Sequence, residues 1–420
     1  MKNIFQETKL WLYVVSLLCF SCYACALERE TYSPLFMCSK KLNNPYGICT
    51  HINRSGNRWE YDTRARDLEM IDSIGATWIR TDFDWTPYLQ KDMKGAFSYR
   101  HHDEMMLSIN ASKKEMFGLL VPPRNKAQYD DWNIYIANVV NRYKDQVKYW
   151  EVINEADIRY KNPVWSWFKA TDYVELLKSG SQTIKKQNKK AIVLFSGMAY
   201  AEKDFLDSVL SQNVSQFFDI MTVHHYTDKI REPEEFLSYY AMLSEKLERH
   251  QIAKPLWLTE TSCFNTIGKK NDTIAAKRLP RIFLISFVCG VEKVFWYKSR
   301  ARELDPNDGE DFYGLWHKDY IPKPAFYTYQ TLTKMCPNKS TRPILSREGN
   351  VYMASWKRPD RKKAWALWTS KTDEVIALDI KGGYKIYNER GEGISDRNLS
   401  EMRITPSVIY IIGAKDVSLR

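Results

Sequence analysis

The chain has 420 residues, of which 44% are hydrophobic and 27% charged, and this composition excludes an intrinsically disordered protein. At about 150 residues per domain, the length suggests two to three domains, or one large barrel with an appendage. The net charge of +11 permits a nucleic-acid partner, but 51 acidic residues are spread along the chain and no basic run or nucleic-acid motif occurs, so we exclude that class. The aromatic content of 14% suits either sugar-ring stacking or a large core.

The N-terminal segment has the pattern of an export signal. Two lysines precede an apolar run over residues 10–20, which is shorter than the ~20 residues needed to cross a bilayer. Ala24-Cys25-Ala26 fits a cleavage site, and Cys22 and Cys25 also fit the lipid-modified cysteine of a bacterial lipoprotein. We therefore expect residues 1–26 to be a signal peptide. The mature protein would be secreted, periplasmic or an outer-surface lipoprotein, and it would meet a membrane only through a lipid anchor.

Cysteine and histidine usage argues against disulfide scaffolding and metal binding. Removal of residues 1–26 leaves five cysteines, an odd number that excludes a disulfide framework for a chain of this length. Cys38 and Cys49 are close enough for one local bridge, and the others are expected as buried thiols. No His or Cys cluster has metal-ligand spacing. We expect no metal and no cofactor.

Residues 46–335 alternate between short apolar runs and amphipathic helical patterns. The expected strands are 46–52, 76–83, 116–121, 147–153, 191–195, 217–224, 255–259 and 291–296. The expected helices are 64–74, 103–112, 129–143, 171–187, 201–211, 234–250, 273–289 and 325–335. Several strands are apolar on both faces, as parallel strands covered by helices must be. This alternation predicts a (β/α)₈ TIM barrel over residues 27–340; an open doubly wound sheet is disfavoured because no phosphate-binding loop follows any strand.

The pattern changes after residue 343. Short strands are expected at 351–356, 363–368, 374–379, 384–387 and 408–412, separated by Gly- and Pro-containing turns. We expect a small C-terminal antiparallel β-sandwich over residues 341–420.

Two carboxylates stand at the ends of strands that lie across the predicted barrel from each other. Glu155 follows the fourth strand and Glu260 follows the seventh, and active sites of such barrels lie at the C-terminal strand ends. Glycoside cleavage needs two opposed carboxyl groups, one to protonate the leaving oxygen and one to attack or support the anomeric carbon. A separation of ~5–5.5 Å gives retention of configuration, and a wider one gives inversion.

The sequences around these carboxylates resemble a known clan. Trp-Glu-Val-Ile-Asn-Glu at 150–155 and Leu-Trp-Leu-Thr-Glu-Thr at 256–261 resemble the two signatures of glycoside hydrolase clan A. Trp-Ile-Arg-Thr-Asp at 78–82, His-His-Tyr at 224–226 and Trp-Tyr at 296–297 fit the same clan. The chain is most similar to family thirty-nine, which comprises β-xylosidases, α-L-iduronidases and bacterial exopolysaccharide endoglycosidases. The resemblance covers about residues 46–415.

The resemblance implies roles for individual residues. Glu155 corresponds to the general acid/base and Glu260 to the nucleophile. Asn154 would hydrogen bond the sugar 2-hydroxyl. Arg80 would keep Glu260 ionised, because an adjacent cation lowers the pKa of a carboxylate. Burial and the charge of Glu260 would raise the pKa of Glu155.

Three further residues follow from the same resemblance. Period-two alternation places His224 and Tyr226 on one strand face, which matches the clan, so both are expected to bind substrate and Tyr226 to contact the nucleophile. His225 points away on this interpretation and is expected to pack. Trp296 would form the stacking floor of the subsite for the sugar that is cleaved.

Other residues each have two interpretations. His51 at the end of the first strand either contacts substrate or makes a structural hydrogen bond. Three loop tryptophans either line outer sugar subsites or pack their loops, namely Trp85, Trp165 and Trp167. A basic cluster beyond the eighth strand either recognises a uronic acid or is a solvated loop, with the second favoured; it comprises Lys298, Arg300 and Arg302.

We therefore expect an exported retaining glycoside hydrolase that acts on a β-linked oligo- or polysaccharide through a covalent glycosyl-enzyme. The basic net charge mildly favours an anionic glycan. A non-catalytic carbohydrate-binding protein on a glycosidase scaffold and a transglycosylase are the alternatives.

Overall fold

The computed structural model describes residues 30–52, 64–84, 98–161, 167–227, 231–263, 272–395 and 399–419. The expected signal peptide, Trp85 and Trp165 lie outside these residues. Within the described ranges, no helix is both long enough and apolar enough to cross a membrane.

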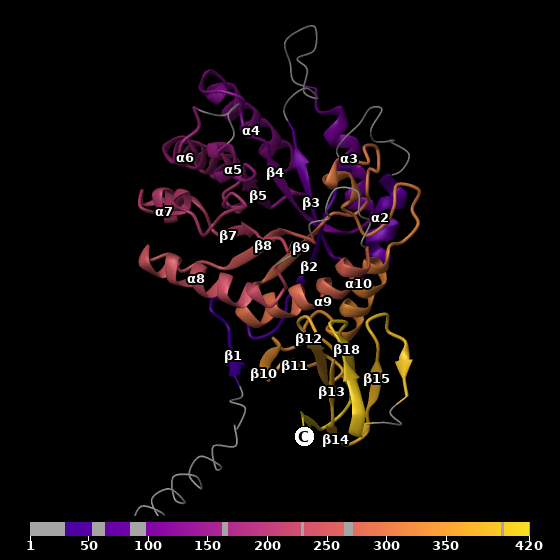
Figure 1. Ribbon diagram of the computed structural model, residues 1–420. Helices are drawn as coiled ribbons and strands as arrows, with labels where there is room; N and C mark the ends of the chain where they lie inside the picture. The colour runs from indigo at the N-terminus through magenta and orange to yellow at the C-terminus, as the bar shows by residue number, and fades with distance from the viewer. Residues whose placement is uncertain are drawn as a thin grey trace, which may run out of the picture.

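The first part of the chain forms a parallel barrel (Figure 1). Its eight strands are β2 (Tyr46–Cys49), β3 (Trp78–Phe83), β4 (Glu115–Leu120), β5 (Tyr149–Val152), β6 (Ile192–Leu194), β7 (Met221–His224), β8 (Leu256–Thr261) and β9 (Lys293–Tyr297). They hydrogen bond in the order β6-β5-β4-β3-β2-β9-β8-β7. Parallel bridges from Leu194 to Ile220 and from Met198 to Val223 bring β6 beside β7 and close the circle. The predicted (β/α)₈ barrel is confirmed.

Helices surround the barrel because each carries one apolar stripe that packs on the strands. They are α2 (Arg64–Ser73), α3 (Arg100–Ala111), α4 (Tyr129–Tyr143), α5 (Ala156–Lys161), α6 (Ala170–Gln187), α7 (Asp204–Leu210), α8 (Glu235–Arg249), α9 (Asp272–Cys289) and α10 (Pro324–Met335). Short 3₁₀ helices are η2 (Lys126–Gln128), η4 (Val214–Phe217), η5 (Gly309–Phe312) and η6 (Leu399–Glu401). In α4, for example, Trp132, Ile136 and Val139 are fully buried at helical spacing. The short helix α5, directly after β5, was not expected from the sequence.

Aromatic side chains fill the interior of the barrel below the site. Trp78 of β3 lies edge-on to Trp257 of β8, with ring centroids 5.4 Å apart. Phe117 of β4 lies edge-on to Phe295 of β9 at 4.9 Å. Much of the aromatic content therefore packs the barrel, and only the strand ends above this layer are open to a ligand.

The C-terminal region is a β-sandwich that also contains the first described strand. Its strands are β1 (Glu30–Tyr32), β10 (Ile344–Glu348), β11 (Val351–Lys357), β12 (Lys363–Thr369), β13 (Glu374–Ile376), β14 (Leu378–Lys381), β15 (Lys385–Tyr387), β16 (Gly393–Ile394), β17 (Met402–Ile404), β18 (Ile409–Ile412) and β19 (Asp416–Leu419). A seven-stranded sheet has the order β1-β10-β11-β12-β18-β15-β16, and the pairs β13-β17 and β14-β19 are separate two-stranded sheets. The predicted sandwich is confirmed. Strand β1 pairs with β10, so residues 30–32 join this sheet although the sequence grouped them with the barrel.

The sandwich packs directly below the barrel helices (Figure 1). The indole of Trp356 donates to the carbonyl of Met335 at the end of α10, at 3.1 Å. The indole of Trp368 donates to the Glu234 carboxylate at 2.7 Å. Trp365 faces the other way, into the core of the sandwich.

All five described cysteines are free thiols, so the local bridge that the sequence allowed between Cys38 and Cys49 does not form. Cys49 is buried in the barrel, where its thiol donates to the carbonyl of Thr259 at 3.3 Å. A strand residue that faces the barrel interior cannot reach a partner in the N-terminal segment outside it.

Candidate active site

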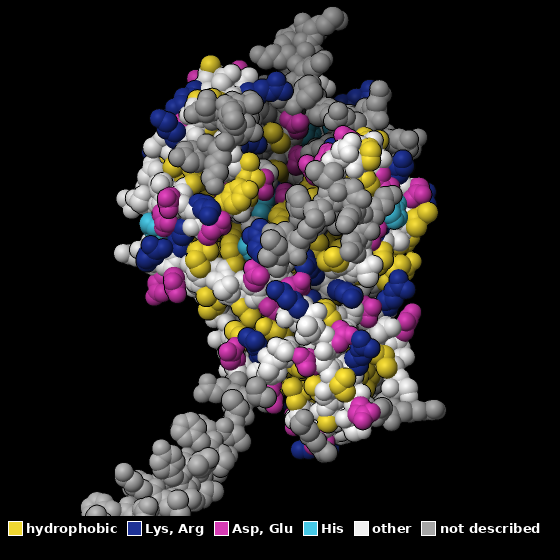
Figure 2. Space-filling view, in the orientation of Figure 1, with side chains coloured by type: hydrophobic (Ala, Val, Ile, Leu, Met, Phe, Trp, Pro, Cys, Tyr) yellow, Lys and Arg dark blue, Asp and Glu magenta, His cyan; other side chains and the backbone are white. Residues whose placement is uncertain are grey.

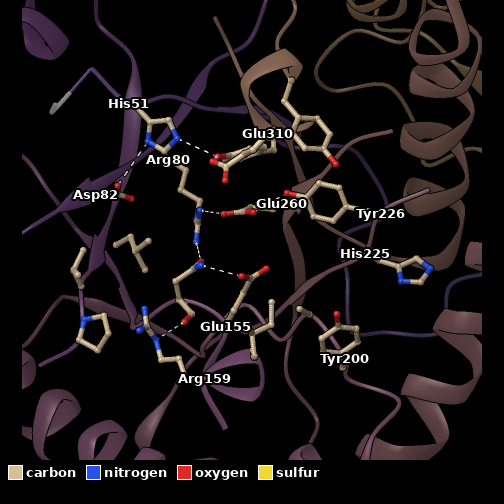
Figure 3. Close-up of a pocket in the computed structure, with 18 of the residues that line it drawn as sticks. His51, Arg80, Asp82, Glu155, Arg159, Tyr200, His225, Tyr226, Glu260 and Glu310 are labelled. Carbon is tan, nitrogen blue, oxygen red and sulfur yellow. Dashed lines mark hydrogen bonds and ion pairs between the residues drawn. The ribbon is translucent and has the colours of Figure 1, made fainter. Parts of the chain in front are cut away.

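A pocket of about 970 Å³ opens at the C-terminal ends of the barrel strands. Acidic side chains gather in this hollow in the upper half of the molecule (Figure 2). Glu155 and Glu260 both line it, from opposite sides of the barrel, as do Arg80, Asn154 and Tyr226 (Figure 3). The structure thus brings together five of the residues that the sequence assigned to the site.

Glu155 is aimed into the pocket by an unusual backbone turn at the end of β5. Ile153 and Glu155 have φ angles of 59° and 46°, in the left-handed region that β-branched and bulky residues rarely adopt. Such conformations cluster at functional sites, where the surrounding structure holds them. The Glu155 carboxylate accepts from His224 Nδ1 at 2.9 Å and from the Asn154 side-chain amide at 3.3 Å.

Glu260 reaches the pocket through an irregularity in β8. Strict alternation from Trp257, which faces the barrel interior, would turn residue 260 toward the helices. The pairing of β8 with β9 shifts register between Leu258 and Thr261, and such a shift re-aims the side chain beside it. The Glu260 carboxylate accepts from Tyr226 Oη at 2.7 Å. It also accepts from Arg80 Nη1.

Arg80 connects the nucleophile candidate to the rest of the site. Its Nε donates to Glu151 at 2.8 Å and its Nη2 donates to the Asn154 side-chain oxygen at 2.7 Å. Glu151 is fully buried and also accepts from Thr259 at 3.1 Å. A buried carboxylate beneath a guanidinium needs such partners, since an unpaired buried charge is costly. Glu151 therefore holds Arg80 in place from below.

The surroundings push the pKa values of the two carboxyl groups in opposite directions. Burial raises the pKa of Glu155, and the charge of Glu260 adds to this although His224 opposes it. Burial would also raise the pKa of Glu260, but His224, Arg80 and the Tyr226 hydroxyl outweigh it and lower that pKa. The surroundings thus favour the protonated form of Glu155 and the ionised form of Glu260, as a general acid and a nucleophile require.

His224 does not line the pocket but lies beneath both carboxylates. Its Nδ1 is 2.9 Å from Glu155 and 3.6 Å from Glu260. Burial lowers its pKa, but the charges of Glu260 and Glu155 reverse this and raise it overall. The ring is fully buried, so the expected contact between His224 and substrate is corrected to a positioning role.

The facing atoms of Glu155, His224 and Glu260 all lie within 4.8 Å of one another. A cation could be considered for such a group. Glu260, however, already accepts from the Arg80 guanidinium, whose positive charge opposes a metal ion at the same carboxylate. The close approach is better suited to two carboxyl groups that act on one bond.

Gly197 leaves room for the His224 ring. A methyl group on Gly197 would lie 2.0 Å from His224 Nε2. We expect Gly197→Ala to lower the free energy of unfolding by about 1–3 kcal/mol through overpacking and to lower kcat by displacing the imidazole under Glu155. Thermal unfolding and steady-state kinetics measure both effects. Gly383→Ala, with no atom within 4 Å, is the control; equal behaviour of the two variants would contradict this account.

The expectation for Trp296 is wrong, because its neighbour Tyr297 lines the pocket and Trp296 does not. On β9, Phe295 and Tyr297 face the barrel interior, so alternation turns Trp296 to the helix side, where it is buried in the core. Tyr297 lines the pocket, and its hydroxyl donates to Glu310 at 2.7 Å. His51 also lines the pocket and lies 3.2 Å from the Tyr297 hydroxyl.

The basic cluster beyond β9 does not enter the pocket. Arg302 pairs with Asp311 at 2.5 Å, Arg300 lies 3.4 Å from Asp67, and Lys298 donates to the carbonyl of Glu310 at 3.2 Å. These contacts hold the loop on the barrel, so neither uronic-acid recognition nor a solvated loop describes the cluster.

The structure also places His225 and Trp167. His225 stacks on Tyr239 at a centroid distance of 3.9 Å, turned away from the carboxylates, while also lining the pocket edge (Figure 3). Trp167 packs against Phe168 and the core.

Several pocket residues were missed because no sequence pattern distinguishes them. Arg159 follows Glu155 by one turn of α5, Tyr200 lies on the loop after β6, and Glu310 lies on η5 far from any strand end. Asp157 lies just after the Asn-Glu motif, but its burial under the loop after β6 could not be predicted, because that contact forms only in the folded barrel.

The solved structures to which this structure is similar include glycoside hydrolases. No family model matches the sequence. The structure is similar to a family 39 glycoside hydrolase from the gut symbiont Bacteroides cellulosilyticus WH2, with a TM-score of 0.71 and 18% identity over 89% of this chain and 81% of that one. At this identity the likeness shows the fold.

Two further structures agree. A GH39 β-xylosidase from Caulobacter crescentus has a TM-score of 0.64 and 14% identity over 91% of this chain and 99% of that one. A GH30 endoxylanase from Clostridium papyrosolvens C71 has a TM-score of 0.61 and 13% identity over 92% of this chain and 100% of that one. The similarity to clan A that the motifs indicated is therefore confirmed at the level of the fold.

Proposed function

We propose that this protein is a retaining glycoside hydrolase that cleaves a β-linked oligo- or polysaccharide. The observation that carries the proposal is the pair Glu155 and Glu260, whose facing oxygens lie within 4.8 Å in one pocket. That upper bound on the distance between the facing oxygens is nearer to the roughly 5–5.5 Å between the carboxyl groups of retaining enzymes than to the roughly 6.5–9.5 Å of inverting enzymes.

In the first step, the Glu260 carboxylate attacks the anomeric carbon while Glu155 gives its proton to the glycosidic oxygen. The carbon–oxygen bond to the leaving sugar breaks, and an ester joins Glu260 to the remaining sugar. Arg80 and Tyr226 hold the Glu260 carboxylate by hydrogen bonds. Asn154, which Arg80 orients, is placed to bind the sugar 2-hydroxyl.

In the second step, Glu155 acts as a base. It takes a proton from water, the water oxygen attacks the anomeric carbon, and Glu260 leaves as a carboxylate. His224 holds Glu155 at 2.9 Å, which orients the carboxyl group for both steps. A transglycosylase would use another sugar hydroxyl in place of water, with the same residues.

The charges around the pocket favour a neutral sugar over Glu260. Asp82, Asp84 and Glu310 line the pocket together with His51, and Glu310 lies on the far side of Glu260 from Glu155 (Figure 3). Carboxylates accept hydrogen bonds from sugar hydroxyls and repel a uronate. The β-xylosidase among the similar structures acts on such a neutral sugar. Anionic groups, if the glycan carries them, fit better near Arg159, on the Glu155 side.

We also propose that the protein is exported. The support is the charged start, short apolar run and small-residue site of residues 1–26. The two cysteines in that segment leave a secreted and a lipid-anchored form equally supported.

The stereochemistry of the first product tests the mechanism. The substrates are 4-nitrophenyl β-glycosides of xylose, glucose, galactose and glucuronic acid. Proton NMR monitors the anomeric form of the released sugar during hydrolysis. We expect the β-anomer of the released sugar to appear first and to mutarotate later. Initial formation of the α-anomer would contradict the retaining mechanism. Binding without turnover of any member would favour a carbohydrate-binding protein.

The pH dependence of kcat/KM is expected to be bell-shaped. Activity requires Glu260 ionised and Glu155 protonated. Because the pKa of Glu260 is lowered and that of Glu155 is raised from the usual 4.5, the acid limb lies below that value and the alkaline limb above it. Initial rates on the best aryl glycoside measure the profile. A value of kcat/KM that keeps rising with pH and shows no alkaline limb would contradict the role of Glu155.

A further inference from the structure

The cleft does not end at the two carboxylates. A second hollow of about 560 Å³ shares Tyr200 and Lys203 with the catalytic pocket. Its other walls come from the start of α6 and from one face of α7. They combine apolar surface, such as Phe205, with polar groups, such as Lys169 and Ser208, which suit the C–H faces and the hydroxyl groups of a glycan.

Tyr200 stands at the junction of the two hollows. Its side chain is 41% exposed, although large aromatic side chains are usually well buried. An exposed ring that borders two adjoining hollows offers a flat apolar face, and the C–H face of a pyranose packs on such a surface.

The loop that carries Tyr200 is tied to the catalytic turn. Asp157, two residues after Glu155, accepts from the backbone N–H groups of Ala199 at 3.1 Å and Tyr200 at 2.5 Å. Asp157 is buried, so these hydrogen bonds are shielded from water and hold the loop firmly. The position of the ring is therefore set relative to the acid Glu155.

The second hollow lies on the leaving-group side. In Figure 3, Tyr200 and Arg159 lie on the Glu155 side of the site, whereas His51 and Glu310 lie beyond Glu260. The acid must reach the glycosidic oxygen and the nucleophile must reach the anomeric carbon. A glycan chain therefore runs from the Glu310 side, over both carboxylates, toward Tyr200.

We propose that Tyr200 and the second hollow bind at least two sugar units of the leaving group, so that the substrate is an oligo- or polysaccharide extended beyond the cleaved bond. This inference rests on the proposed function and adds the length and the binding place of the leaving part of that glycan. A small aryl leaving group reaches only the first hollow and does not use the second.

The test compares Tyr200→Ala with wild type on two kinds of substrate. The first are the 4-nitrophenyl glycosides named above, and the second are β-1,4-linked hexasaccharides of xylose and of glucose. We expect kcat/KM for the cleaved hexasaccharide to fall about tenfold, because a stacked ring is lost, and kcat/KM for the aryl glycoside to fall distinctly less, because its leaving group does not fill the second hollow. The matched control is Tyr327→Ala on α10, where the tyrosine is 40% exposed and lines neither hollow.

Mass spectrometry of the hexasaccharide products in ¹⁸O-labelled water locates the cleaved bond. We expect leaving fragments of at least two sugars. Equal losses on both substrates, no loss on the hexasaccharide, or release of only a single reducing-end sugar would overturn the inference while wild-type turnover still supports the proposed function. If the wild type neither cleaves nor binds any substrate, the proposed function and the inference fall together.

Discussion

Glu260→Gln is expected to abolish turnover while the protein stays folded. An amide cannot act as a carboxylate nucleophile, so no glycosyl-enzyme forms. We expect kcat to fall by at least about 10⁴-fold, equivalent to about 5.4 kcal/mol of transition-state stabilisation. Stopped aryl-glycoside assays measure the loss. The substituted side chain keeps its shape, and Arg80 retains Glu151 as an ionic partner.

One control variant and one further measurement make this result specific. Glu248→Gln on the exposed face of α8 makes the same substitution away from the pocket and should keep wild-type rates. Loss of the Glu260 charge should also lower the pKa of Glu155, because that charge helps to raise it, and carbon-13 NMR of labelled glutamate measures this shift. A Glu260→Gln variant with near-normal turnover would show that the nucleophile is another residue.

Glu155→Gln is expected to have an effect that depends on the leaving group. A sugar leaving group needs a proton, and general acid catalysis contributes about 10²- to 10⁴-fold. A 2,4-dinitrophenolate needs none, so its release should slow by less than about tenfold. The second step then becomes limiting because the base that activates water is missing.

Azide distinguishes this role from a structural one. A small anion needs no base, so it should attack the glycosyl-enzyme, restore turnover in Glu155→Gln and yield a β-glycosyl azide. Glu248→Gln should be unaffected by azide. Equal losses on both leaving groups, with no azide product, would remove Glu155 from the acid/base role.

Fold and catalytic pair were both accessible from the sequence because they depend on local patterns. The helix over residues 129–143 was expected with the bounds that α4 has, since its apolar stripe is strict. Glu155 and Glu260 directly follow apolar strand runs in recognisable motifs. Parallel barrel geometry then places such residues together.

The predictions that were wrong or missing concern residues whose positions depend on contacts between distant parts of the chain. Trp296 and Tyr297 differ by one position, and the strand alternation that separates them is determined by which side of β9 faces the interior. The buried ion pairs of Arg300 and Arg302 depend on Asp67 and Asp311, which approach only in the folded barrel. Tyr200 has no motif at all, and its importance arises from the meeting of two hollows.

Covalent trapping tests the central claim most directly. The wild-type protein is incubated with 2,4-dinitrophenyl 2-deoxy-2-fluoro-β-glycosides of xylose, glucose and galactose, and peptic fragments are mapped by mass spectrometry. A fluorine at carbon 2 slows the second step, so the glycosyl-enzyme accumulates. We predict one sugar bound per protein molecule, on the peptide that contains Glu260, and no label on Glu260→Gln. Hydrolysis of the parent glycosides without an adduct, or an adduct on another residue, would contradict the assignment of Glu260 as nucleophile.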